Sequence, residues 1–415
     1  MTHAKRTLAA MLIPFALTGA AQAQLSLPGR LPTLGDVLGE VRRGVDVASD
    51  LPSRAARALA DARTLRIGAL VRAHPDRIAI DPDGFAARVG EVVVDDADDA
   101  LIAKAAAKGY AVIERGDILG IGFVRLATPP GQSLKTAIRG LKTLGAKQVS
   151  ADQLHAQSGV AVSADGRAAV DDGAAGSDGP GPMIGMIDGG VDRAGSAQRG
   201  FATGAPRASD HGSAVASLIV GRGMVRGAAP TARLHVADVY GSDPAGGNAV
   251  AIAKALGWLV TEHVPVVTIS LVGPPNPLLA RVVAAAQARG TIVVAAVGND
   301  GPAAPPSYPA SYPGVIAVTG VDVRGRVLIE AGRATHLDYA APGADMLAAD
   351  ATGRATAVRG TSFAAPLVAA RIARAYPTVD EGARKRAIRA VDAAAKPGSR
   401  YGRGLVCGDC RTPAK

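Results

Sequence analysis

The sequence predicts an α/β protein, with a parallel sheet flanked by helices and preceded by a small α+β domain. From Met183 onward, short runs of Val, Ile and Ala alternate with helical segments, which is typical of parallel strands buried on both faces. Residues 90–150 instead follow the order strand, helix, two strands, helix, strand. Only 3% of the 415 residues are aromatic whereas 48% are hydrophobic, so the cores must be built mainly from aliphatic side chains.

Residues 1–23 have the three parts of a secretory signal peptide. Lys5 and Arg6 precede an apolar run at 8–17, and Ala21-Gln22-Ala23 has the form of a cleavage site. The apolar run is short for a membrane span, and no later stretch reaches the roughly 18 apolar residues that a transmembrane helix needs. We therefore expect export to the periplasm or the exterior, with no membrane span once the signal is removed. Residues 24–89 form an extension whose role the sequence does not indicate.

Residues 90–150 are predicted to form a ferredoxin-like domain. Asp98 and Ser133 are placed to cap its two helices, and Gly116-Asp117 is a turn signal between its two central strands. Its predicted strands are 91–94, 110–114, 118–127 and 146–149, and its helices are 98–108 and 133–144. A domain of this size is only marginally stable alone, so we expect it to dock on a partner.

Residues 151–182 are rich in Gly, Ala, Asp and Ser and lack hydrophobic periodicity. This composition predicts an exposed, flexible linker of the kind that proteases cut.

The domain predicted for residues 183–406 places polar residues where open α/β sheets place their sites, outside the strand ends. Asp188 follows the first strand, and His211 and Ser362 each open a helix. A serine hydroxyl is a poor nucleophile, so His211 would have to take its proton and Asp188 would have to hold the imidazole. Each residue alone also fits a turn or a helix cap, so the interpretation depends on their coincidence.

Four segments resemble the motifs of the subtilisin-like serine proteases, the subtilases. They are Asp188-Gly189-Gly190-Val191, His211-Gly212-Ser213-Ala214-Val215-Ala216, Ala295-Ala296-Val297-Gly298-Asn299 and Gly360-Thr361-Ser362-Phe363-Ala364-Ala365-Pro366. The resemblance covers about Met183 to Val406. It implies that Asp188, His211 and Ser362 form a catalytic triad. It also implies that Asn299 donates a side-chain N–H to the oxyanion, beside the backbone N–H of Ser362.

The resemblance further implies two walls around an extended peptide substrate. One wall would pair with the peptide and line the pocket for the residue before the scissile bond, and the other would face it. The first wall consists of Ser270, Leu271, Val272 and Gly273, and the facing wall consists of Ala295, Ala296, Val297 and Gly298. Their small and apolar linings favour a broadly apolar preference in that pocket.

Three residues depart from those common in the family, namely Gly189, Ser213 and Leu367, and none of them removes a reacting group. Only 23 positions separate Asp188 from His211, so loops that often hold calcium in subtilases look trimmed. No carboxylate cluster has clear calcium spacing. We expect no cofactor and no metal site, and leave a need for calcium open.

Subtilases are commonly made with a ferredoxin-like propeptide that assists folding and then inhibits the enzyme, and residues 90–150 resemble that unit. The resemblance implies a zymogen that cuts itself between about Val149 and Gly181, with its own propeptide as an intramolecular inhibitor. The rival interpretation is a catalytically inactive subtilase-fold module that binds peptides. An esterase is disfavoured because Ser362 lacks the Gly-x-Ser-x-Gly elbow.

The remaining features indicate no further activity. The net charge of +10, which falls to +8 when the signal leaves, is spread among acidic residues, so no nucleic-acid site is expected. His235 and His263 look structural. Cys407 and Cys410, in the tail at 407–415, favour a disulfide in an exported protein, since a zinc site would need about two further ligands.

Overall fold

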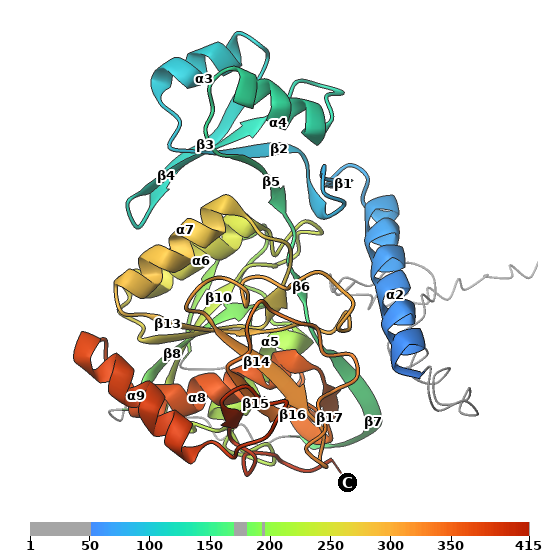
Figure 1. The fold of residues 1–415 in the computed structure, drawn as a ribbon, viewed down its shortest axis with the longest axis vertical. Coiled ribbons are helices and arrows are strands. Elements are labelled where there is room, and N and C mark those ends of the chain that lie inside the picture. Colours follow the sequence, from blue (N-terminus) through green and yellow to red (C-terminus); the bar gives the residue numbers. More distant parts are fainter. Residues whose placement is uncertain (1–50, 170–180, 193–195, 415) are drawn as a thin grey trace, which may run out of the picture.

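The computed structural model describes residues 51–169, 181–192 and 196–414 (Figure 1). The predicted signal peptide and the first part of the extension lie outside these residues. Within them, no helix is both long and apolar enough to span a bilayer.

The larger domain is built on a sheet of eight parallel strands, in the order β18-β15-β14-β13-β11-β8-β10-β9. The strands are β8 (Met183–Asp188), β9 (Ala197–Gly200), β10 (Arg233–Asp238), β11 (Val266–Ile269), β13 (Ile292–Ala296), β14 (Ile316–Val321), β15 (Tyr339–Pro342) and β18 (Gly404–Leu405). The predicted parallel sheet is confirmed.

Helices cover both faces of this sheet, which explains why its strands are apolar at nearly every position. Alternate residues of β8 point to opposite faces: Ile184 and Met186 contribute to one core, and Ile187 to the other. The first core is closed by α5 (Asp210–Val220) and α8 (Ala365–Ala375), with α9 (Glu381–Ala394) packed on α8. The second is closed by α6 (Ala249–Thr261) and α7 (Pro277–Ala288).

The smaller domain has the strand order β5-β2-β4-β3, with antiparallel neighbours, which is the ferredoxin-like arrangement. Its elements are β2 (Ala86–Asp95), α3 (Asp99–Ala106), β3 (Ala111–Ile118), β4 (Ile121–Ala127), α4 (Leu134–Thr143) and β5 (Val149–Gln153), and β1 (Ile78–Ile80) also pairs with β2. The side chains of Asp98 and Ser133 cap the two helices as predicted.

The predicted turn at Gly116-Asp117 is wrong, because β3 continues to Ile118. The reversal lies at Leu119 and Gly120, which both have positive φ. Gly116 is a strand residue beside the ring of Phe123, where an added Cβ would lie 2.9 Å from a ring carbon. This glycine therefore makes room for an aromatic neighbour across the hairpin.

The sheet of the smaller domain packs on α6 and α7 (Figure 1). Val93, Ile118, Ile121 and Phe123 share a buried core with those helices. Ion pairs flank this contact, from Lys254 to Glu114 and from Arg281 to Asp95 and Asp96. The expected docking of the small domain is thus made within the same chain.

The predicted flexible linker at 151–182 is wrong for residues 151–169. After β5, β6 (Ala156–Gln157) pairs with β12 (Leu271–Val272), and β7 (Val160–Ala169) pairs with β17 (Arg354–Arg359), which also pairs with β16 (Met346–Ala349). Strand pairing satisfies backbone groups whatever the side chains are, so a composition of small and polar residues did not reveal it.

Candidate active site

Asp188 and His211 lie together at the carboxyl end of strand β8. Asp188 ends β8 and is fully buried, and His211 lies in the first turn of α5, which Ser209 caps by accepting a hydrogen bond from Gly212 N. The Nδ1 atom of His211 lies 2.9 and 3.0 Å from the two carboxylate oxygens of Asp188. This contact fixes the imidazole and leaves Nε2 as the nitrogen available to a substrate or nucleophile.

Ser362 lies in the short 3₁₀ turn η1 (Thr361–Phe363). The predicted helix therefore begins later, at Ala365, and the ring of Phe363 lies 5.4 Å from that of His211, centroid to centroid. The Nε2 atom of His211 is buried and has no hydrogen-bond partner within the described part of the chain. Asp188 and His211 are thus hydrogen-bonded in this structure, whereas Ser362 Oγ is hydrogen-bonded to groups other than His211.

The partner of Ser362 is Ser158, which directly follows β6. The Oγ atoms of the two serines are 2.6 Å apart, and Ser362 Oγ also contacts the carbonyl oxygen of Ser158. That carbonyl oxygen accepts hydrogen bonds from Ser362 N, at 3.1 Å, and from Asn299 Nδ2. The backbone N–H of Ser362 and the side-chain amide of Asn299, which the family resemblance assigns to the oxyanion, thus both donate to the carbonyl oxygen of Ser158.

Thr361, which was not singled out in the sequence, positions Asn299. Its backbone N–H donates to Asn299 Oδ1 at 3.0 Å, so the amide group turns Nδ2 toward Ser158. Its hydroxyl is bonded to both backbone groups of Gly298, at 3.0 and 3.1 Å.

Residues 154–158 lie as an extended strand along the predicted substrate wall. Leu271 pairs with Gln157 and Val272 with Ala156, and the strand continues in a bridge between Leu154 and Asn248. Further backbone bonds run from Ser158 N to Ser270 O, at 3.4 Å, and from His155 N to Gly247 O, at 2.8 Å. The segment therefore occupies the place that the sequence assigned to a peptide substrate.

Two side chains of this strand, those of His155 and Ser158, are buried, whereas Ala156 is exposed. Gln157 Nε2 donates to Asp188 Oδ1 at 3.1 Å. The ring of His155 is 1% exposed and lies against Gly273, where an added Cβ would meet it at 2.6 Å. Burial lowers the pKa of His155 to about 4, so this imidazole is neutral at pH 7.

The second predicted wall contributes less than expected. The side chains of Ala295, Ala296 and Val297 pack into the two cores beside the sheet rather than toward the peptide. Gly298 is the member of this wall that faces Val272. The alternation of side chains along β13 accounts for this, because the strand is covered on both faces.

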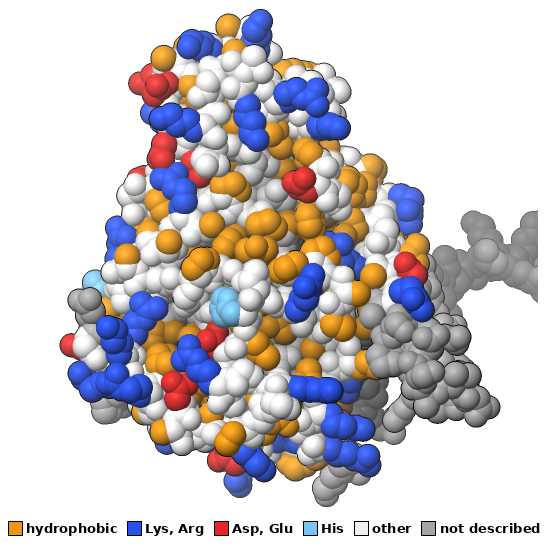
Figure 2. Space-filling view, viewed as in Figure 1, with side chains coloured by type: hydrophobic (Ala, Val, Ile, Leu, Met, Phe, Trp, Pro, Cys, Tyr) orange, Lys and Arg blue, Asp and Glu red, His pale blue; other side chains and the backbone are white. Residues whose placement is uncertain are grey.

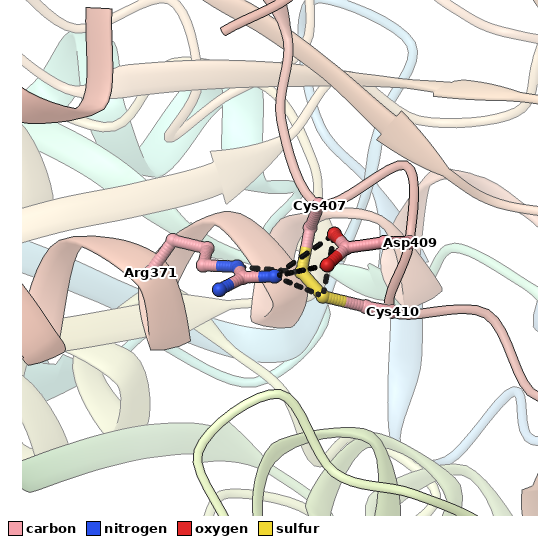
Figure 3. Close-up of a disulfide and its surroundings, with 4 residues drawn as sticks. All are labelled: Arg371, Cys407, Asp409 and Cys410. Atoms are coloured by element: carbon pink, nitrogen blue, oxygen red, sulfur yellow. Dashed lines mark hydrogen bonds and ion pairs between the residues drawn. A yellow bond between two sulfur atoms is a disulfide. The ribbon is translucent and has the colours of Figure 1, made fainter. Parts of the chain in front are cut away.

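Cys407 and Cys410, for which the sequence favours a disulfide, are joined by one (Figure 3). Arg371 of α8 contacts both sulfur atoms and pairs with Asp409 at 2.9 Å, which fastens the tail to the helix that follows Ser362. These two cysteines and Asp409 are the single cluster of potential metal ligands among the described residues, and the disulfide leaves no thiolate for a metal.

Lys and Arg side chains are spread over both domains on the face shown in Figure 2, interspersed with apolar and neutral surface.

Comparison with known proteins places these residues in a family context. Residues 187–400, just over half of the chain, match the model of the subtilase family. Subtilisin BL from Lederbergia lenta is 35% identical over 176 residues, which cover 41% of this chain and 65% of the relative. The major intracellular serine protease of Bacillus subtilis is 35% identical over 172 residues, covering 39% of this chain and 54% of the relative. The chain thus spans less than two thirds of the length of these curated relatives.

Two solved structures share the fold. Fervidolysin from Fervidobacterium pennivorans, described as a keratinolytic enzyme related to subtilisin, matches with a TM-score of 0.65 at 20% identity, over 80% of this chain and 63% of its own. The epidermin leader peptide processing serine protease of Staphylococcus aureus matches with a TM-score of 0.57 at 17% identity, over 78% of this chain and 97% of its own. Taken with the family match, they show that the chain has a subtilisin-like fold and belongs to the subtilase family.

Proposed function

We propose that the chain is an exported serine endopeptidase made as a self-processing zymogen, which first cuts its own Ser158–Gly159 bond. One observation carries the proposal: the carbonyl oxygen of Ser158 lies between Asn299 Nδ2 and Ser362 N, with Ser362 Oγ in contact with it. Donors aimed at the oxygen where negative charge will develop are what acyl transfer requires.

In the proposed reaction, three side chains carry out the attack and the proton transfers. Ser362 Oγ attacks the carbonyl carbon of Ser158 while His211 Nε2 takes its proton, and Asp188 stabilises the imidazolium. The tetrahedral intermediate collapses as His211 returns the proton to the amine of Gly159, which leaves. Water then hydrolyses the ester between Ser158 and Ser362, with His211 again acting as base. Before the attack, the Ser362 hydroxyl must release the Oγ atom of Ser158 and donate its hydrogen bond to His211 Nε2 instead.

The N-terminal part of the chain is the proposed intramolecular inhibitor. After cleavage, residues 154–158 would stay paired with β12 until the small domain leaves α6 and α7, and protein substrates would then take the same extended place. Export is supported by the signal-like pattern at 1–23 and by the disulfide, which suits an oxidising compartment.

The experiment that tests this proposal is intact-mass analysis of the purified protein together with labelling by a fluorophosphonate probe. We expect a mature fragment that begins at Gly159 and carries the probe on Ser362. The mass of the released N-terminal fragment also reports whether residues 1–23 were removed. An intact chain that ignores the probe would instead support the inactive peptide-binding module, with residues 154–158 as its built-in ligand.

Helix α2 (Leu51–Ala73) contacts both residues 154–158, here called the inhibitory strand, and the loop that follows Asn299. In the middle of the helix, Leu59 is 2% exposed and packs on Gly301, and Arg63 and Arg66 pair with Asp300, the neighbour of Asn299. Near its end, its apolar side chains share a small core with Leu154 of the inhibitory strand; they are Ile67, Leu70 and Val71.

We predict that the double variant Arg63→Ala, Arg66→Ala is cut at the same bond but becomes active sooner. Partly exposed ion pairs contribute about 0.2 to 1 kcal/mol each, so loss of both should quicken release of the cut fragment by roughly two- to thirtyfold. The measurement is the lag between cleavage, followed by mass, and activity on a peptide substrate.

A matched control removes two arginines that are exposed on the same helix, Arg57 and Arg72. All three proteins yield the same mature enzyme, so a difference in lag reports release alone. An equal lag for both double variants would contradict an inhibitory role for α2.

A further inference from the structure

We propose that Val272 restricts the pocket for the residue before the scissile bond to small side chains, namely Gly, Ala and Ser. This inference rests on the proposed function and names the class of peptide bond that the site accepts. It replaces the broad apolar preference that the wall residues suggested from the sequence.

Val272 bridges the two walls of that pocket. It belongs to β12, the wall that pairs with the inhibitory strand, and Gly298 lies on the opposite wall. A Cβ atom added to Gly298 would lie 3.3 and 3.5 Å from the two methyl groups of Val272, and 3.0 Å from Ser307 Oγ. The valine side chain therefore reaches the opposite wall and fills the space between them.

Hydrogen bonds hold both walls in place. Gly273, next to Val272, exchanges two backbone hydrogen bonds with Tyr308, of 2.9 and 3.0 Å. On the other wall, Gly298 is bonded through both backbone groups to the Thr361 hydroxyl. Widening the pocket would break such bonds in a buried site and leave their donors and acceptors unsatisfied.

The chain's own residue at this position is small, which is an independent observation. Ser158 is 3% exposed, and its Oγ lies 2.6 Å from Ser362 Oγ and 3.4 Å from Ser270 O. Its side chain is thus accommodated beside the nucleophile and needs no deep pocket. Forcing extra side-chain volume into a packed site pushes side chains away from their preferred rotamers and shifts the backbone. We therefore expect bonds after Phe or Leu to be cut roughly 10- to 100-fold more slowly than bonds after Ser or Ala.

The test changes the pocket and its occupant in the same precursor. Ser158→Phe should slow self-cleavage at least roughly tenfold, and Ser158→Ala, which is as small as serine, should be cut at a rate close to that of the unaltered chain. Adding Val272→Gly to Ser158→Phe should restore cleavage after residue 158. The readout is the first-order rate constant of cleavage, followed by intact mass, and thermal unfolding of each precursor checks that it is folded.

A second readout uses peptides with the sequence of residues 154–162 and Ser, Ala, Leu or Phe at the fifth position, cut by mature enzyme. In the unaltered enzyme, kcat/KM for the Ser peptide should be much larger than kcat/KM for the Phe peptide. The Val272→Ala variant should lower this ratio at least tenfold. Val272→Ala also serves in place of Val272→Gly if the glycine variant does not fold. Equal cleavage of Ser158 and Ser158→Phe precursors, or an unchanged ratio in a folded Val272 variant, would overturn the inference. If the unaltered chain cuts neither itself nor the peptides, the proposed function fails instead.

Discussion

Replacing Ser362 by Ala should leave the precursor whole at the Ser158–Gly159 bond. Without Oγ, the buried carbonyl group of Ser158 has no nucleophile beside it, while the donors from Asn299 and from the backbone of residue 362 are retained. Loss of the same hydroxyl in subtilisin lowers kcat by about 10⁶-fold, so a reaction that takes minutes would not be seen over months. Intact mass of the two purified proteins, compared side by side, measures this.

Cleavage should also occur within one molecule. Ser158 is 3% exposed and already lies at Ser362 of its own chain, so the half-time of cleavage should not depend on protein concentration. Mature enzyme added to the Ser362→Ala precursor should reach the same bond only after the inhibitory strand leaves its own cleft. Appearance of the Gly159 terminus in the pure Ser362→Ala protein would show that another protease makes the cut, and would refute self-processing.

Those parts of the fold that depend on local sequence signals were predictable. Asp98 and Ser133 cap helices where the sequence predicts caps, because a short polar side chain before an apolar helix satisfies a free backbone N–H of the first turn. The parallel sheet followed from strands that are apolar on both faces. The proximity of Asp188 and His211 followed from their positions at a strand end and a helix start.

The parts that depend on contacts between distant residues were not predictable from one sequence. Ser158 meets Ser362 across 204 positions, and the pairing that brings it there runs through backbone groups, which every sequence carries. The proposed narrowing of the substrate pocket by Val272 depends on the distance from Val272 to Gly298, which lies in the segment after β13. No local sequence pattern encodes that distance. Residues 154–158, which pair with β12, therefore looked like part of a linker.

Replacing Asp188 by Asn should slow self-cleavage by about 10⁴-fold, although the cleft stays almost unchanged in shape. The Oδ1 atom of Asp188 accepts hydrogen bonds from Gly189 N, at 2.7 Å, and from Gln157 Nε2, at 3.1 Å. An asparagine oxygen would be held at the Oδ1 position by the same donors and would stay 2.9 Å from His211 Nδ1, so the NH₂ group would take the place of Oδ2, 3.0 Å from the same nitrogen. The NH₂ group opposes a proton on Nδ1, and a neutral amide no longer stabilises an imidazolium, so the tautomer with the proton on Nε2 is favoured. Nε2 could then no longer accept the proton of Ser362.

Asp238 provides the matched control, because it ends the neighbouring strand β10 in register with Asp188 and is equally buried. It accepts hydrogen bonds from three backbone N–H groups, those of Arg207, Tyr240 and Gly241, and burial raises its pKa. Asp238→Asn would lose one acceptor and about 1 to 3 kcal/mol of unfolding free energy, but should cleave itself within a few-fold of the normal rate. Rate constants from intact mass and midpoints from thermal unfolding separate the two variants. Equal slowing of both would mean that Asp188 acts on the stability of the cleft rather than on the protonation of His211.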